Sequence, residues 1–155
     1  MPKVKKPIQL LIFIGFCLSA GAIGSIFTAS AIPTWYANLI KPTFSPPNWI
    51  FAPVWTTLYI LMGISAYLVW IKKNNALKLF WVHLTVNVAW SYLFFGLRNP
   101  FYGLICILVL WGLIVAVIYK FSKIDKRSAY LLYPYLAWVT FATFLNYNIW
   151  ILNTP

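Results

Sequence analysis

Five apolar runs, each long enough to be a membrane-crossing helix, constrain what this chain can fold into. A helix needs about 20 mainly apolar residues to cross about 30 Å of hydrocarbon. The runs cover residues 7–31, 49–71, 77–97, 101–121 and 129–152. Only 8% of the residues are charged and 63% are hydrophobic, so polar side chains are too few to cover such a core in water. The sequence predicts an all-α integral membrane protein, with residues 1–155 forming one bundle of five transmembrane helices.

The breaks between the runs differ in length and composition. Short polar breaks separate the last four runs, so we expect these helices to be antiparallel neighbours. The break after the first run is longer, covers residues 32–48, and contains Pro33, Pro42, Pro46 and Pro47. Because proline fixes φ and removes a backbone donor, we expect this loop to be a semi-rigid cover.

The first run also resembles a cleavable signal peptide, because lysines precede it and Ala29-Ser30-Ala31 end it. Its apolar core exceeds the roughly 7–15 residues of such a signal, so we expect it to be retained as a helix. The small residues of this run are Gly15, Ser19, Ala20, Gly21, Gly24 and Ser25. Their spacing allows close helix approach, either inside the bundle or at a dimer seam.

The basic residues predict an orientation. One side of the membrane would carry Lys3, Lys5, Lys6, Lys72, Lys73, Lys78, Lys120, Lys123, Lys126 and Arg127. Of the 12 basic residues, only Lys41 and Arg98 fall on the other side. By the positive-inside rule the N terminus is inside and the C terminus outside. The net charge of +11 therefore belongs to membrane-flanking loops, and we expect no nucleic-acid partner.

The ionisable residues are too few for a conventional catalytic or metal site. One acidic residue, Asp125, and one histidine, His83, cannot supply a carboxylate pair, a Ser-His-Asp arrangement or a set of metal ligands. We expect His83 to be a hydrogen-bonded structural residue, with a proton relay as the alternative. Cys17 and Cys106 lie inside apolar runs and are expected to act as small hydrophobes. No metal and no cofactor is predicted.

Aromatic and amide side chains recur at helical spacing in three of the runs. These stripes are Trp55, Leu58, Tyr59 and Met62 in the second run, His83, Asn87, Trp90, Ser91 and Phe94 in the third, and Trp138, Phe141, Ala142, Leu145 and Asn146 in the fifth. Facing one another, they would enclose an apolar pocket in which an amide or an indole N–H fixes the orientation of a ligand. The alternative is that the stripes pack together and the amides bond between helices.

Three motifs resemble those of a known family. The first runs from Trp35-Tyr36 through Lys41-Pro42, Pro46-Pro47-x-Trp49 and Pro53-Val54-Trp55 to Thr57-Leu58-Tyr59, the second is Asn87-x-x-Trp90-Ser91-x-x-Phe94-Phe95-Gly96, and the third is Pro134-Tyr135-x-x-Trp138-x-x-Phe141-Ala142-Thr143-x-Leu145-Asn146-Tyr147. Together they cover nearly the whole chain. They are similar to those of the translocator protein family, also called the tryptophan-rich sensory protein (TspO/MBR) or peripheral benzodiazepine receptor family.

This resemblance implies a five-helix bundle, commonly a homodimer, that binds porphyrins and other tetrapyrroles, sterols in animal members, and synthetic apolar ligands. The expected function is that of a membrane-embedded binding protein acting as sensor, scavenger or regulator. Candidate ligand-binding residues are Tyr36, Trp49, Trp55, Asn87, Trp90, Trp138, Ala142, Leu145 and Asn146.

The resemblance leaves two other functions open. Some bacterial members are reported to degrade protoporphyrin IX in light, and the tryptophans implicated match Trp55 and Trp138, which are the candidate catalytic residues. An indole beside an excited porphyrin could react without an acid–base pair. A transporter of tetrapyrroles or sterols is the third hypothesis, although five spans do not divide into the paired repeats usual for secondary carriers.

The end of the fifth run departs from the animal members of the family. They carry a cholesterol-recognition pattern with a basic residue soon after a tyrosine, whereas Tyr147 is followed by no cation. The same loose pattern is matched by Val117, Tyr119 and Lys123, which shows how permissive it is. The outer C terminus looks more like that of a bacterial member.

Overall fold

The computed structural model describes residues 6–155 and has five helical spans long and apolar enough to cross a membrane. The long helices are α1 (Lys6–Ala31), α2 (Phe51–Trp70), α3 (Lys78–Ser91), α4 (Pro100–Ser122) and α6 (Tyr133–Leu152). Shorter elements are η1 (Tyr36–Asn38), η2 (Asn48–Ile50), η3 (Asn74–Leu77), η4 (Tyr92–Gly96) and α5 (Lys126–Leu131). The described residues contain no strand. The predicted five-helix membrane bundle is therefore confirmed.

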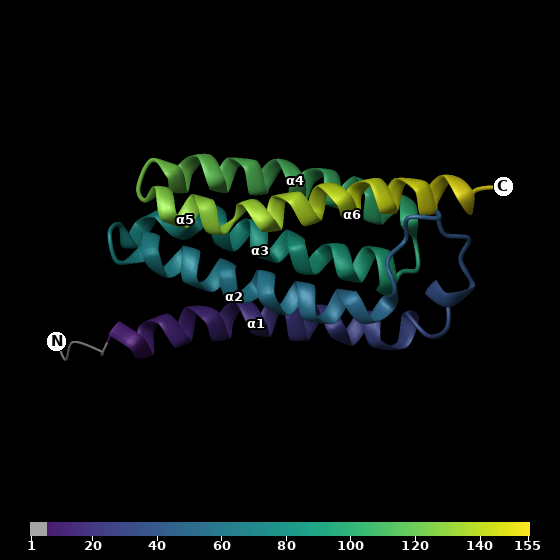
Figure 1. Ribbon diagram of the computed structural model, residues 1–155, viewed down its shortest axis with the longest axis horizontal. Helices are drawn as coiled ribbons and strands as arrows, with labels where there is room; N and C mark the ends of the chain where they lie inside the picture. Colours follow the sequence, from purple (N-terminus) through teal and green to yellow (C-terminus); the bar gives the residue numbers. More distant parts are fainter. Residues whose placement is uncertain (1–5) are drawn as a thin grey trace.

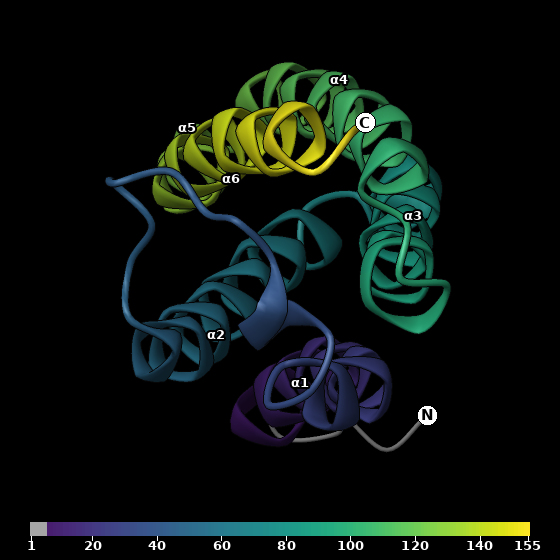
Figure 2. The same cartoon turned by 90° about the vertical axis from the view of Figure 1, so that its right-hand side faces the viewer.

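The helices run along one axis and surround a common interior (Figure 1). Viewed from the end that carries the C terminus, they follow one another in the order α1, α2, α6, α4 and α3 (Figure 2). α1 packs against α2 and α3, and α4 packs against α3 and α6. α2 is joined to the last span mainly through α5, which it contacts. The bundle is thus more tightly closed at the end where α5 lies.

The two ends of the bundle differ in charge. The end at which α1 begins, called the basic end here, carries Lys6, Lys72, Lys73, Lys78, Lys120, Lys123, Lys126 and Arg127. Lys3 and Lys5 lie outside the described residues. The opposite end, called the loop end, carries Lys41 and Arg98 together with the long first loop (Figure 1).

Two turns show how local sequence sets the helix boundaries. Arg98 adopts a left-handed conformation with φ of 53°, which ends the third span. Asn99 then caps α4, because its Oδ1 accepts hydrogen bonds from the N–H groups of Phe101 and Tyr102 at 3.1 Å each. The predicted fifth run is divided at Leu132 into α5 and α6, since Pro134 has no N–H with which to continue the ladder.

The third span ends in a wider, π-helical turn, η4. The N–H of Leu97 donates to the carbonyl of Tyr92 at 2.8 Å, five residues back. Such turns arise where an extra residue is accommodated within a helix, often at functional sites. This turn presents Phe94 and Phe95 to the interior of the bundle.

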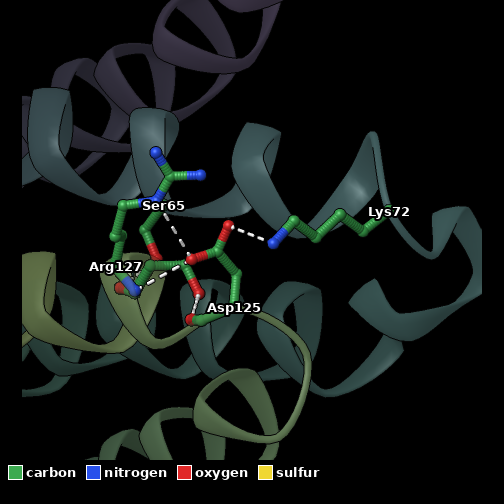
Figure 3. A network of polar contacts seen from close by, with 5 residues as sticks. Ser65, Lys72, Asp125 and Arg127 are labelled. Carbon is green, nitrogen blue, oxygen red and sulfur yellow. Dashed lines mark hydrogen bonds and ion pairs between the residues drawn. The ribbon is translucent and has the colours of Figure 1, made fainter.

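The only acidic residue of the chain, Asp125, ties α2 to the turn between α4 and α5 (Figure 3). Its Oδ2 lies 2.8 Å from Nζ of Lys72. Its Oδ1 accepts the N–H of Arg127 at 2.9 Å and so caps α5. Ser65 Oγ donates to the carbonyl of Ser128 at 2.8 Å. The hydrogen bond from Lys72, followed by those from Arg127, holds the pKa of the Asp125 carboxyl below its ordinary value.

The small residues of α1 divide between the interior and the surface. A Cβ on Gly21 would lie 2.6 Å from the Tyr59 ring, and one on Gly24 would lie 3.1 Å from Ser91 Oγ. These two glycines therefore permit packing inside the bundle. A Cβ on Gly15 would meet nothing within 4 Å, so the dimer seam stays a prediction for that outer part of the helix. At Gly63 of α2 the neighbour is backbone, because a Cβ there would lie 2.6 Å from the Cα of Ile14.

Candidate functional site

The loop end of the bundle contains a cavity of about 380 Å³. This volume falls within the roughly 300–1,000 Å³ typical of small-molecule sites. α1 contributes Leu18, Gly21, Ala22, Gly24, Ser25 and Thr28, the loop and η2 contribute Ile32, Tyr36 and Asn48, α2 contributes Phe51, Ala52, Trp55, Thr56 and Tyr59, α3 and η4 contribute Trp90, Ser91, Phe94 and Phe95, and α6 contributes Trp138, Ala142, Leu145, Asn146 and Ile149. None of these lining side chains is an acid, a base or a histidine.

One wall of the cavity is an aromatic surface built from α2, α3 and η4. The rings of Trp55 and Trp90 have centroids 6.3 Å apart and planes inclined by 28°. Trp90 and Phe94 continue the series at 5.5 Å and 24°. Aromatic rings attract one another in offset stacks at such separations. The three rings therefore form a stacked aromatic series along the cavity.

The orientation of Trp90 is fixed by a hydrogen bond to α6. Its Nε1 donates to Oδ1 of Asn146 at 3.2 Å. Asn146 in turn donates from Nδ2 to the carbonyl of Pro100 at 2.7 Å. This amide therefore joins the aromatic wall to the start of α4.

Trp138, which belongs to α6, also lines the cavity. Its ring packs against Phe51 at 6.1 Å and against Phe141 at 5.5 Å. Its Nε1 is shielded from solvent and has no hydrogen-bond partner among the described residues. A buried unpaired donor costs about 1–3 kcal/mol. Trp138 also lines a shallow apolar groove between α2 and α6 on the outside of the bundle.

A buried polar network lies at the floor of the cavity. The Tyr59 hydroxyl donates to Oδ1 of Asn87 at 2.6 Å, and Asn87 Nδ2 donates to the Tyr135 hydroxyl at 2.7 Å. Because only Tyr59 of these three residues lines the cavity, Asn87 acts on it through Tyr59. His83 is buried beside Tyr135, and its Nδ1 bonds to the carbonyl of Phe80 at 2.7 Å.

The long loop closes the cavity at the loop end. Tyr36 is only 2% exposed, and its ring packs against Phe95 at 5.7 Å. Burial raises the pKa of the Tyr36 phenol above its ordinary value. Lys41 Nζ donates to the carbonyls of Tyr36 and Leu39 at 2.8 and 3.1 Å, so its charge stabilises the loop. The loop is thus an ordered cover.

Seven of the nine candidate ligand-binding residues come together at the cavity. They are Tyr36, Trp55, Trp90, Trp138, Ala142, Leu145 and Asn146. Trp49 lies outside it on η2, with 74% of its surface exposed. Asn87 is buried beneath the cavity without lining it. The candidate catalytic residues Trp55 and Trp138 both reach the interior.

The wall formed by α1 was missed in the sequence. Its small residues Gly21, Gly24 and Ser25 were interpreted only as sites of close helix approach, inside the bundle or at a dimer seam, and Ala22 was not singled out. The sequence signal that could have identified them is a run of small residues on one helix combined with large aromatic residues on the neighbouring helices, because small side chains leave room for a cavity. The described residues contain no group of three or more His, Cys, Asp or Glu side chains that could hold a metal ion.

Comparison with known proteins identifies close relatives. The model of the TspO/MBR family matches residues 13–151. The tryptophan-rich protein TspO of Chlorobaculum tepidum is 41% identical over 155 residues, covering 96% of this chain and 98% of that protein. Protein CrtK of Rhodobacter capsulatus is 41% identical over 143 residues, with 88% of each chain covered. The human translocator protein is 39% identical over 135 residues, covering 83% of this chain and 80% of its own length.

Proposed function

The chain belongs to the TspO/MBR family of membrane proteins, and on that premise we propose that its cavity binds a porphyrin or another flat tetrapyrrole. The observation that carries the proposal is the stacked aromatic series of Trp55, Trp90 and Phe94 in a cavity without charged side chains. A conjugated macrocycle gains both apolar burial and ring stacking there. The protein then acts as a sensor, scavenger or regulator of such molecules.

The composition of the lining also specifies how the ligand lies. Because no lining side chain is charged, the carboxylates of a porphyrin have no buried partner and point towards the open part of the cavity. The macrocycle lies against the aromatic wall formed by Trp55, Trp90 and Phe94. The cover formed by Tyr36 and its loop holds the ligand in place.

A titration of the purified protein with protoporphyrin IX tests this function. The Soret band of the porphyrin should shift saturably, and Trp55→Leu should raise Kd about three- to tenfold, from the loss of one stacking partner. Trp49→Leu and Trp111→Leu are matched controls, since Trp49 and Trp111 are exposed side chains outside the cavity. A Soret shift that fails to saturate, or an equal loss in all three variants, would contradict the proposal.

Light-driven oxidation of bound porphyrin by dioxygen is a second candidate. It is favoured by the presence of two oxidisable indoles, Trp55 and Trp138, in one cavity. Illumination of the complex under oxygen should give a new absorbing product with the native chain and not with Trp138→Phe. Product formation at the same rate from free porphyrin would exclude this activity.

The proposal includes an orientation and an assembly state. The basic end lies inside and the loop end outside, and two copies associate into a homodimer. The orientation is tested with single cysteines at exposed Lys126 and Thr154, in a background lacking Cys17 and Cys106, and a membrane-impermeant thiol reagent. Only the cysteine at Thr154 should react in intact cells.

A further inference from the structure

A second hollow lies at the basic end of the bundle, remote from the cavity. This groove measures about 650 Å³ and runs between the start of the third span and the end of α4. Its floor is apolar and includes Ala76, Leu79, Ala116 and Ile124. Its rim carries three lysines, which are Lys73, Lys120 and Lys123.

No carboxylate can neutralise these lysines. The only acidic side chain of the chain, Asp125, is 3% exposed and paired with Lys72 at 2.8 Å and with Arg127 at 3.5 Å. Lys123 lies instead over the ring of Tyr119, with Nζ 5.0 Å from the ring centroid. The groove thus combines an apolar floor with three positive charges that have no partner of opposite sign.

The position of the groove sets what can fill it. α4 belongs to the membrane span Pro100–Ser122, so its last turn lies where lipid acyl chains give way to headgroups. Tyr119, which lines the groove, is 65% exposed, as is common for tyrosines at this level. Ala116 lies one turn deeper and is also exposed. An occupant therefore meets positive charge at headgroup level and an apolar surface below it.

We propose that the groove binds an anionic phospholipid. Its phosphate lies among Lys73, Lys120 and Lys123, and one acyl chain descends along the floor past Ala116. Basic pockets between membrane helices favour anionic over zwitterionic headgroups, because a zwitterion brings its own cation to the site. A soluble phosphate would gain the charge but not the floor.

The test is native mass spectrometry of the full-length protein in detergent micelles that contain dioleoyl phosphatidylglycerol or dioleoyl phosphatidylcholine. The native chain should retain one phosphatidylglycerol and bind phosphatidylcholine at least about tenfold more weakly. The triple variant K73Q/K120Q/K123Q should lose affinity by about a hundredfold, at roughly fivefold per lysine. Retention by this variant, or equal binding of the two lipids, would overturn the proposal.

A second triple variant, K6Q/K78Q/K126Q, is the matched control. It removes the same charge from exposed positions at the same end, outside the groove, and should retain the lipid. An equal loss in both triple variants would show a diffuse charge effect and overturn the site. Far-ultraviolet circular dichroism and the melting temperature confirm that each variant is folded.

Two further arms separate a lipid from a soluble phosphate. A116F fills the floor while keeping every lysine, and should weaken phosphatidylglycerol binding about tenfold. Glycerol phosphate at millimolar concentration should not displace the lipid. Unchanged binding by A116F, or displacement by glycerol phosphate, would overturn the assignment to a phospholipid. None of these measurements involves the porphyrin cavity.

Discussion

The side-chain amide of Asn153 holds both backbone groups of Ile40, although the two residues are 113 positions apart. Oδ1 accepts the Ile40 N–H at 2.9 Å, and Nδ2 donates to the Ile40 carbonyl at 2.8 Å. This pair fastens the loop that covers the cavity to the end of α6. The ring of Phe44 in the same loop also packs against Phe141 of α6 at 6.2 Å, so two contacts join the loop to the last helix.

Substitution Asn153→Ala should loosen the cover. Two hydrogen bonds of about 1 kcal/mol each are lost, so porphyrin dissociation should accelerate by about tenfold or more. Backbone amides of residues 36–45 should also exchange faster with deuterium. Asn148→Ala is the control, because the Asn148 amide bonds only within its own helix, to Phe144 at 2.8 Å. Unchanged exchange in Asn153→Ala would show that the loop is held by its other contacts.

Substitution Gly21→Ala should disturb the cavity floor. The new Cβ would lie 2.6 Å from the Tyr59 ring, which is buried and hydrogen-bonded to Asn87 and so cannot move freely. We expect a lower melting temperature and weaker porphyrin binding. Gly15→Ala should instead stabilise the protein by about 0.5–1 kcal/mol, since its Cβ meets nothing within 4 Å. Equal melting temperatures for both variants would contradict this packing.

Substitution Tyr59→Phe separates the two roles of this residue. The aromatic ring stays at the cavity floor, while Asn87 loses the donor that now lies 2.6 Å from its Oδ1. An unpaired buried acceptor costs about 1–3 kcal/mol, so thermal stability should fall while Kd for protoporphyrin IX changes less than about threefold. Asn87→Ala should lower stability in the same way. If Asn87→Ala instead raised Kd strongly at unchanged stability, Asn87 would contact the ligand directly.

The Asp125 network predicts how stability depends on pH. The pKa of Asp125 is lower in the folded protein than in the unfolded chain, chiefly through Lys72. Its stabilising contribution is therefore complete above the unfolded pKa, near 4, and is lost as the pH falls through the folded pKa. The melting temperature of the native protein should drop across this range, and that of Asp125→Asn should drop less. Asparagine is a good helix N-cap, so the cap on α5 is retained. An identical acid profile for both proteins would refute this role.

The five-helix architecture was predictable because each membrane span must meet the same requirement, a long run of apolar residues. A window of about 20 apolar residues needs no knowledge of tertiary packing. The break at Leu132 was not predicted, since the flanking side chains remain apolar and only Pro134 indicates it. A proline at that position is compatible both with a kinked helix and with a new one.

The cavity was predictable only in part. The sequence indicates which face of a helix a residue lies on, but not how far along the helix the cavity extends. Trp49 and Trp55 are six residues apart, which places them about 120° apart around a helix, so phase alone could have separated them. Asn87 and Trp90 lie on one stripe, and only depth distinguishes them. In the second and third runs, Trp55 and Trp90 nearer the loop end line the cavity, whereas Met62 and His83 nearer the basic end pack in the core. In the fifth run, every residue of the stripe except Phe141 lines the cavity. The stripes therefore enclose a cavity over some turns and pack together over others, while ligand binding stays a prediction.

The only acidic side chain of the chain, Asp125, lies at the basic end. This position has a consequence for the cavity at the loop end. No side chain that lines the cavity changes its charge within the physiological pH range. Asp125 forms ion pairs with Lys72 and Arg127. If a ligand binds in the cavity as proposed, acidification would not release it by changing the charge of a lining side chain. Under that proposal, release would depend on opening of the loop that covers the cavity or on competition by another molecule.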